Sequence, residues 1–412
     1  MAESQILQLT LMCRDHEVAR FAWDTGRQAV VGKVQKISPR YLPICCLDPQ
    51  GSFVKSGLTA WFRDRGIPAL RPMVKERLQQ LGYTSVTEIM ARGFGLSLSD
   101  QYWLRPVGSS ASWDEINCFT NAFPEEFGEL MLPYDDSSMP DIVKKLRSSD
   151  ALFKLSPDAA LNGNLPKRWR IEPDGTKVLV KAGRASCRYQ EPFNEVAATA
   201  LCARLMGARE YVSYALEDNG FAKWASVCPT MVDEFSEFVP AFHIHASSKA
   251  PNDQSLFDFY VSACRAHGLD VLQAVEKMLV VDYLTANFDR HWSNFGIIVD
   301  TETREWKAAA PIFDTGESFW CNVDTGQPFR GYVSEKAGAV RPFARDIDSQ
   351  LERFCVDMSW FDARMLDGFA EEACEILRGN PFIANDPGRI DKLHQALCAR
   401  VDRVARHAAT LR

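Results

Sequence analysis

The chain has 412 residues, of which 46% are hydrophobic and 25% charged, and it carries a formal net charge of −7 at pH 7. This composition can bury two or three hydrophobic cores and excludes an intrinsically disordered chain. The acidic balance argues against direct nucleic-acid binding, because phosphate backbones attract clustered Lys and Arg. We find neither a secretory leader nor an apolar run of about 18 residues, so we expect no export and no membrane insertion.

The twelve cysteines are scattered between Cys13 and Cys398 and contain no CxxC motif. Zinc sites need paired ligands at short spacing. The scattered pattern instead favours a reduced protein that uses Cys as a small apolar residue. We therefore expect a cytoplasmic protein.

The first third of the chain is expected to form a region of its own. Residues 5–23 alternate like two strands joined by a turn. A turn-rich stretch over residues 133–140 is typical of a linker, which predicts an N-terminal accessory region over residues 1–148. Short amphipathic helices are expected within it at residues 59–68, 73–81 and 86–91.

The next segment combines strands with one helix. Residues 169–172 and 177–181 flank an Asp-Gly turn and predict a β-hairpin, and an Ala-rich helix is expected over residues 195–206. A strand Lys, here Lys181, followed by a helix Glu, here Glu195, can fix an ammonium against nucleotide phosphates. Taken alone, the same residues also fit a surface Lys and a Glu favoured by the helix dipole. Further strands are expected at residues 211–216 and 221–228.

The most informative motif follows an apolar helix expected over residues 271–284. It supplies Asp289, Asn294 and, after a predicted hairpin, Asp314 in an Asp-x-Gly sequence. An Asp can accept a hydrogen bond from an attacking hydroxyl, while Asn and Asp offer the oxygen ligands that Mg²⁺ prefers. The alternative is that the first two residues only cap turns, as most loop Asp and Asn residues do. Their combination with Asp314 favours a phosphoryl-transfer site.

The sequence Asp289-Arg-His291-x-x-Asn294, followed by Asp314-x-Gly, resembles the catalytic and metal loops of the phosphoinositide 3-kinase-like superfamily. Within that superfamily the chain is most similar to the HipA-like bacterial serine/threonine kinases. The resemblance covers nearly the whole chain in order, with specific motifs only over residues 286–316. It assigns catalysis to Asp289 and His291, metal binding to Asn294 and Asp314, and nucleotide binding to Lys181, Glu195, Gly163, Lys167, Glu234 and Phe235.

Two positions depart from the pattern of that family. Ser293 stands where the catalytic loop usually carries Lys, which removes any role of that Lys here. Ala160 stands where the family has its regulatory phosphoserine, three residues before Gly163. Inhibitory autophosphorylation at this position is therefore not expected.

The fold implied by the resemblance is α+β, a two-lobed protein-kinase-like fold with a β-rich N-lobe over residues 149–238 and a helical C-lobe over residues 239–412. The activity implied is transfer of the γ-phosphoryl group of ATP, with Mg²⁺, to a serine or threonine of a protein. If the protein is the toxin of a toxin–antitoxin pair, the resemblance implies that it would also bind an antitoxin-like partner protein. The alternatives left open are a small-molecule or lipid-headgroup kinase and a nucleotide-binding regulator without turnover.

Overall fold

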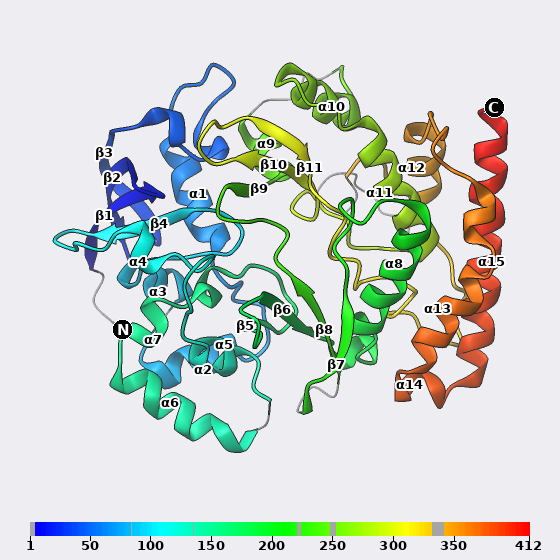
Figure 1. Ribbon diagram of the computed structural model, residues 1–412, viewed down its shortest axis with the longest axis horizontal. Helices are drawn as coiled ribbons and strands as arrows, with labels where there is room; N and C mark the ends of the chain where they lie inside the picture. Colours follow the sequence, from blue (N-terminus) through cyan, green and yellow to red (C-terminus); the bar gives the residue numbers. More distant parts are fainter. Residues whose placement is uncertain (1–4, 84, 135, 221–223, 248–252, 332–341) are drawn as a thin grey trace.

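The computed structural model describes residues 5–83, 85–134, 136–220, 224–247, 253–331 and 342–412. It combines antiparallel sheets with many helices, so the predicted α+β class is confirmed. Figure 1 shows an N-terminal part in blue to teal, a central sheet in teal to green, and a helical part that ends in orange and red. Within these ranges no helix is both long and apolar enough to cross a membrane.

The N-terminal part is built on an antiparallel sheet of strand order β3-β2-β1-β4. Its strands are β1 (Ile6–Cys13), β2 (His16–Asp24), β3 (Ala29–Lys36) and β4 (Tyr102–Pro106). Its helices are α1 (Lys55–Arg65), α2 (Val74–Leu81), α3 (Val86–Arg92), α4 (Trp113–Ile116), α5 (Glu126–Met131), α6 (Met139–Ser148) and α7 (Ala151–Lys154).

The strands and helices predicted for this part are present, although their bounds differ from the prediction. The two strands expected over residues 5–23 are β1 and β2, and the three short helices occur as α1 to α3. Helix α1 begins earlier than expected and ends at Arg65, before Gly66 and Pro68, because proline restricts the residue before it to extended conformations. In the predicted linker, residue 135 lies outside the described residues, and α6 already begins at Met139.

The central sheet has the strand order β5-β6-β8-β7 and is antiparallel throughout. The predicted hairpin is confirmed as β5 and β6, and α8 begins four residues before Glu195, with a proline in its first turn. The strand expected at residue 211 begins later, and the start of the one expected at residue 221 lies outside the described residues. The elements are β5 (Lys167–Ile171), β6 (Lys177–Ala182), β7 (Ala215–Asp218), β8 (Trp224–Pro229) and α8 (Glu191–Leu205).

The helical part surrounds one long buried helix and carries a third sheet of order β11-β10-β9. The sheet consists of β9 (Ser236–Pro240), β10 (Gly296–Asp300) and β11 (Trp306–Ala309). Its helices are α9 (Ala241–Ser247), α10 (Leu256–Ala266), α11 (Leu272–Thr285), α12 (Ile347–Phe354), α13 (Phe369–Arg378), α14 (Pro381–Ala384) and α15 (Pro387–Thr410). Short 3₁₀ turns lie at Pro39–Tyr41, Ile44–Cys46, Asp136–Ser138, Pro157–Ala160, Ala185–Cys187 and Ala363–Leu366.

Helix α11 explains the apolar run of the sequence. Its residues from Val275 to Thr285 are all buried, so it is enclosed on every side rather than on one face. Ala286 then adopts a left-handed conformation with φ of 54° and ends the helix. This abrupt end places the following loop beside the hairpin of β10 and β11.

The N-terminal part is fastened to the rest of the chain by buried polar side chains. The amide of Gln101 donates to the carbonyls of Asp233 (2.8 Å) and Ser236 (2.6 Å) and accepts from the hydroxyl of Thr301 (2.9 Å). Arg304 donates to both carboxylate oxygens of Glu237 and to a tyrosine hydroxyl of β4. Because these groups are withdrawn from water, removing any one would leave its partners unsatisfied.

Candidate functional site

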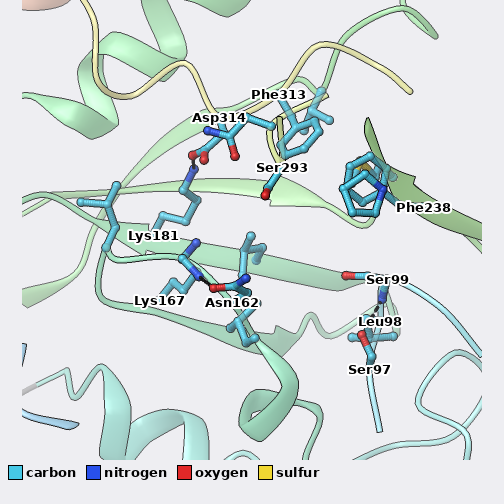
Figure 2. A pocket seen from close by; sticks show the side chains of 18 of the residues that line it. Ser97, Leu98, Ser99, Asn162, Lys167, Lys181, Phe238, Ser293, Phe313 and Asp314 are labelled. Atoms are coloured by element: carbon cyan, nitrogen blue, oxygen red, sulfur yellow. Dashed lines mark hydrogen bonds and ion pairs between the residues drawn. The ribbon is translucent and has the colours of Figure 1, made fainter. Parts of the chain in front are cut away.

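A cavity of about 550 Å³ lies where the three parts meet. Its volume falls within the usual range of small-molecule sites. Figure 2 shows Lys167, Lys181 and Asp314 at one end and Phe238 with Ser97, Leu98 and Ser99 at the other. Of the residues singled out from the sequence, those that line the cavity are Ala160, Gly163, Lys167, Lys181, Asp289, His291, Ser293, Asn294 and Asp314.

Lys181 is the central cation of the site. Its side chain is 3% exposed at the end of β6, and its ammonium binds Glu195 of α8 and, at 2.6 Å, Oδ1 of Asp314. The hydroxyl of Ser226 on β8 donates to the other oxygen of Glu195. Burial by itself lowers the pKa of Lys181, but the two carboxylates outweigh it and hold that pKa well above its ordinary value. The lysine is therefore charged at every physiological pH.

Lys167 lies directly opposite Lys181 in the register of β5 and β6. It is 7% exposed, and within the described chain no carboxylate forms an ion pair with it. Burial lowers the pKa of Lys167 to about 7, although Asp314 opposes that effect. A buried ammonium without a partner is costly unless an anion arrives to neutralise it.

Gly163 makes room for that lysine. Its φ is +104°, and a Cβ at this position would collide with Nζ of Lys167. The loop is held from outside by Arg71 of the N-terminal part, which donates to the carbonyls of Leu161 and Gly163, the latter at 2.9 Å. Asn162 donates to a carbonyl at the end of α1 at 2.8 Å. The loop of residues 161–163, which we call the glycine loop, is thus held by hydrogen bonds beside Lys167 at the lysine-lined end of the cavity.

The loop after α11 positions Asp289 and Asn294. The backbone amide of Asp289 donates to the side chain of Asn287 (3.0 Å), which itself donates to Asp282 of α11 (2.8 Å). The side-chain amide of Asn294 donates to the carbonyl of Asp289 at 3.2 Å. With its nitrogen used in this way, Asn294 presents its amide oxygen for other contacts.

Arg290 holds the two acidic loops together, a role that the sequence reasoning missed. Its side chain is 1% exposed and binds both carboxylate oxygens of Asp282, at 2.9 and 3.0 Å. The same guanidinium donates to the carbonyls of Asn294 (2.6 Å) and Phe313 (2.7 Å). The planar fork of an arginine suits such a junction. The signal in the sequence was Asp282, an acidic residue within the apolar end of the helix.

His291 is a neutral imidazole within the same loop as Asp289 and Asn294. Its Nδ1 accepts from the backbone amide of Ser293 at 3.2 Å, so the ring hydrogen resides on Nε2. Nε2 lies 4.0 Å from Oδ2 of Asp289. Burial lowers the pKa of His291 below its ordinary value, which keeps the ring uncharged near neutral pH. The histidine therefore orients the loop without adding a charge to it.

Asp314 is held in an uncommon backbone conformation with φ of 56°. Burial raises the pKa of its carboxyl, but Lys181 and Lys167 lower it more, so it is ionised far below neutral pH. Among the described residues no group of three or more His, Cys, Asp or Glu comes together to hold a metal ion. Asp314 and Asn294 both line the cavity and could supply a carboxylate and an amide oxygen, the kind of ligand that Mg²⁺ prefers.

Glu234 and Phe235 are not among the described residues that line the cavity. They lie in the turn between β8 and β9, where Phe235 is exposed and Arg14 stacks on its ring. The carbonyl of Asp233 beside them is occupied by Gln101. Met231, closer to the end of β8, does line the cavity, and its backbone amide and carbonyl have no hydrogen-bond partner among the described residues.

No family model matches the sequence, and no curated protein matches it. Among solved structures, the chain is similar to the crystal structure of a Helicobacter pylori proinflammatory kinase, CtkA. The two share 17% sequence identity with a TM-score of 0.44, over 60% of this chain and 94% of the other. A likeness at this level assigns neither a family nor an activity, so the function rests on the site itself.

Proposed function

We propose that the protein is an ATP- and Mg²⁺-dependent phosphotransferase. One observation carries the proposal: the buried ammonium of Lys181 is held between Glu195 and Asp314 in the same cavity that Asp289 and Asn294 line. A lysine fixed by a helix glutamate beside a metal-binding aspartate is the arrangement that phosphoryl transfer requires. A purely structural ion pair would not need a cavity, nor beside it a second buried lysine, Lys167, that forms no ion pair with the residues the structure describes.

The roles follow from the chemistry of each side chain. Lys181 and Lys167 would bind phosphate oxygens, and Asn294 with Asp314 would hold Mg²⁺. The metal supplies neutralisation of the charge that develops on the phosphates. Asp289 accepts a hydrogen bond from the acceptor hydroxyl and orients its oxygen. As that oxygen bonds to the γ-phosphorus, its proton passes to the carboxylate of Asp289, the bond from the γ-phosphorus to the β–γ bridging oxygen breaks, and ADP leaves.

The acceptor we propose is a serine or threonine hydroxyl of another protein in the cytoplasm, in keeping with the HipA-like motif around Asp289 and Asn294. An antitoxin-like protein partner belongs to the same proposal. A kinase of a small molecule could use the same residues to bind Mg²⁺ and ATP, and would differ only in the molecule that receives the phosphoryl group. The experiment below therefore asks both whether phosphoryl transfer occurs and whether a protein receives the label.

The test incubates purified protein with γ-labelled ATP and Mg²⁺, with and without cell lysate. The matched variants are Asp289→Ala and Asp391→Ala, the latter removing a carboxylate exposed on α15. We expect label on a protein with the wild type and with Asp391→Ala, and none with Asp289→Ala. Transfer that persists in Asp289→Ala would refute the role of this residue. Magnesium-dependent ATP binding without any transfer would instead identify a nucleotide-binding regulator.

A further inference from the structure

The cavity has two ends of opposite character. At one end lie the buried lysines Lys167 and Lys181, which Figure 2 shows at the same end of the cavity. At the other end, Figure 2 shows the apolar or hydroxylic residues Leu98, Ser99 and Phe238, and the charged residues of this lining are Asp64, Arg65 and Asp100. A free polyphosphate would fill only the cationic end. A nucleotide, with an anionic tail and a flat apolar base, matches both ends at once.

The neutral end is built by the N-terminal part of the chain. Its lining residues come from the end of α1, including Trp61 and Arg65, and from residues 97–100 before β4. Arg65 forms a buried ion pair with Asp100 and also donates to the carbonyls of Gly95 (3.1 Å) and Tyr102 (3.2 Å). The charge of Arg65 is thereby neutralised. Residues 97–100, which we call the wall, therefore do not attract phosphate.

The wall is hydrogen-bonded to β9, which forms the floor of the cavity. The backbone amide of Phe238 on β9 donates to the carbonyl of Ser99 at 2.9 Å. The backbone amide of Ser99 donates to the hydroxyl of Ser97 at 3.0 Å, which sets the turn. Two residues later Gln101 binds the turn before β9. The wall and β9 therefore form one rigid unit at the neutral end.

We propose that the N-terminal part of this chain is a working component of the nucleotide site: its residues 97–100 form the wall against which the base and sugar lie, facing Phe238 and the open backbone of Met231. The inference rests on the proposed function, because it takes the ligand to be a nucleoside triphosphate. It assigns to the accessory region a direct contact with the ligand. Base selection then depends on residues that precede the catalytic motifs by almost two hundred positions.

The test compares two probes, MgATP and magnesium tripolyphosphate, by titration calorimetry on the full chain. Ser99→Trp fills the neutral end and leaves the lysines untouched. The matched control is Val107→Trp, which adds the same bulk at an exposed position just beyond β4. We expect Ser99→Trp to weaken MgATP by at least about tenfold, the usual scale of overpacking, and to leave tripolyphosphate binding unchanged. The control should alter neither.

The outcomes separate the two proposals. If the wild type binds MgATP and Ser99→Trp binds it equally well, or if both probes weaken together, the inference about the wall is overturned while the proposed function stands. If the wild type binds neither probe, the proposed function fails first. Should Ser99→Trp not fold, Leu98→Ala tests the same wall by removing apolar contact. It is expected to weaken MgATP several-fold and to spare tripolyphosphate.

Discussion

Nucleotide affinity should depend on pH through Lys167, the buried lysine that forms no ion pair with the described residues. Burial lowers the pKa of Lys167 to about 7, whereas its ordinary value is 10.5. Phosphate oxygens stabilise the charged form of the ammonium, so the ligand selects the protonated protein. Above pH 7 binding must therefore be accompanied by uptake of a proton. Below pH 7 the lysine is already charged and affinity should level off.

The magnitude follows from that pKa alone. Between pH 7 and pH 9 the dissociation constant should rise about fiftyfold, or about 2.3 kcal/mol, if the bound lysine stays charged. At pH 8 about nine-tenths of the free protein has a neutral Lys167, so each MgATP should take up about 0.9 proton. Titration calorimetry in two buffers of different ionisation enthalpy measures that uptake directly.

Stability should move in the opposite direction. Because the pKa of Lys167 is lower in the folded than in the unfolded chain, the unfolded chain binds more protons between about pH 7 and pH 10.5. The free energy of unfolding of the ligand-free protein should therefore rise with pH across that window through this group. Lys167→Met is the control and should lose both the proton uptake and this contribution. A wild type whose affinity and proton uptake match those of Lys167→Met would refute the reasoning.

Three substitutions test the surrounding geometry. Gly163→Ala should weaken MgATP to the level of Lys167→Met, because its Cβ would displace that ammonium; unchanged calorimetric affinity would contradict this. Lys181→Met should lower the free energy of urea unfolding by about 3–5 kcal/mol, because Glu195 would stay buried without its cation, and adding Glu195→Leu should restore much of it. Arg290→Lys should slow phosphoryl transfer about a hundredfold, since an ammonium cannot replace the fork that aligns both loops; full activity would refute that role.

The parts of the site that could be predicted are those built from local sequence. The hairpin with Lys181, the helix with Glu195 and the loop with Asp289 each follow from periodicity, turn residues and spacing within a short window. The structure brings Lys181, Glu195 and Asp314 into contact as one charged cluster. Which roles these residues have stays a prediction until transfer is measured.

The parts that could not be predicted depend on contacts between distant segments. The resemblance assigns Glu234 and Phe235 to nucleotide binding, but neither is among the described residues that line the cavity. Gln101 occupies the carbonyl beside them from 132 positions away. The clamp of Arg71 on the glycine loop likewise joins residues 92 positions apart, to Gly163. No periodicity or turn rule reports such pairs, because they are set by how whole parts of the chain dock.

The fastening by Gln101 also sets an order of events during synthesis. Its side chain binds Thr301, which lies 200 residues later in the chain. At roughly 5–20 residues per second, the ribosome needs about 10–40 s to make the second residue after the first. During that interval the β1–β4 sheet can form, while the side-chain oxygen of Gln101 still lacks the hydroxyl of Thr301 as its partner. The site is therefore complete only after the hairpin of β10 and β11 has been made, because Asp314 follows that hairpin in the chain.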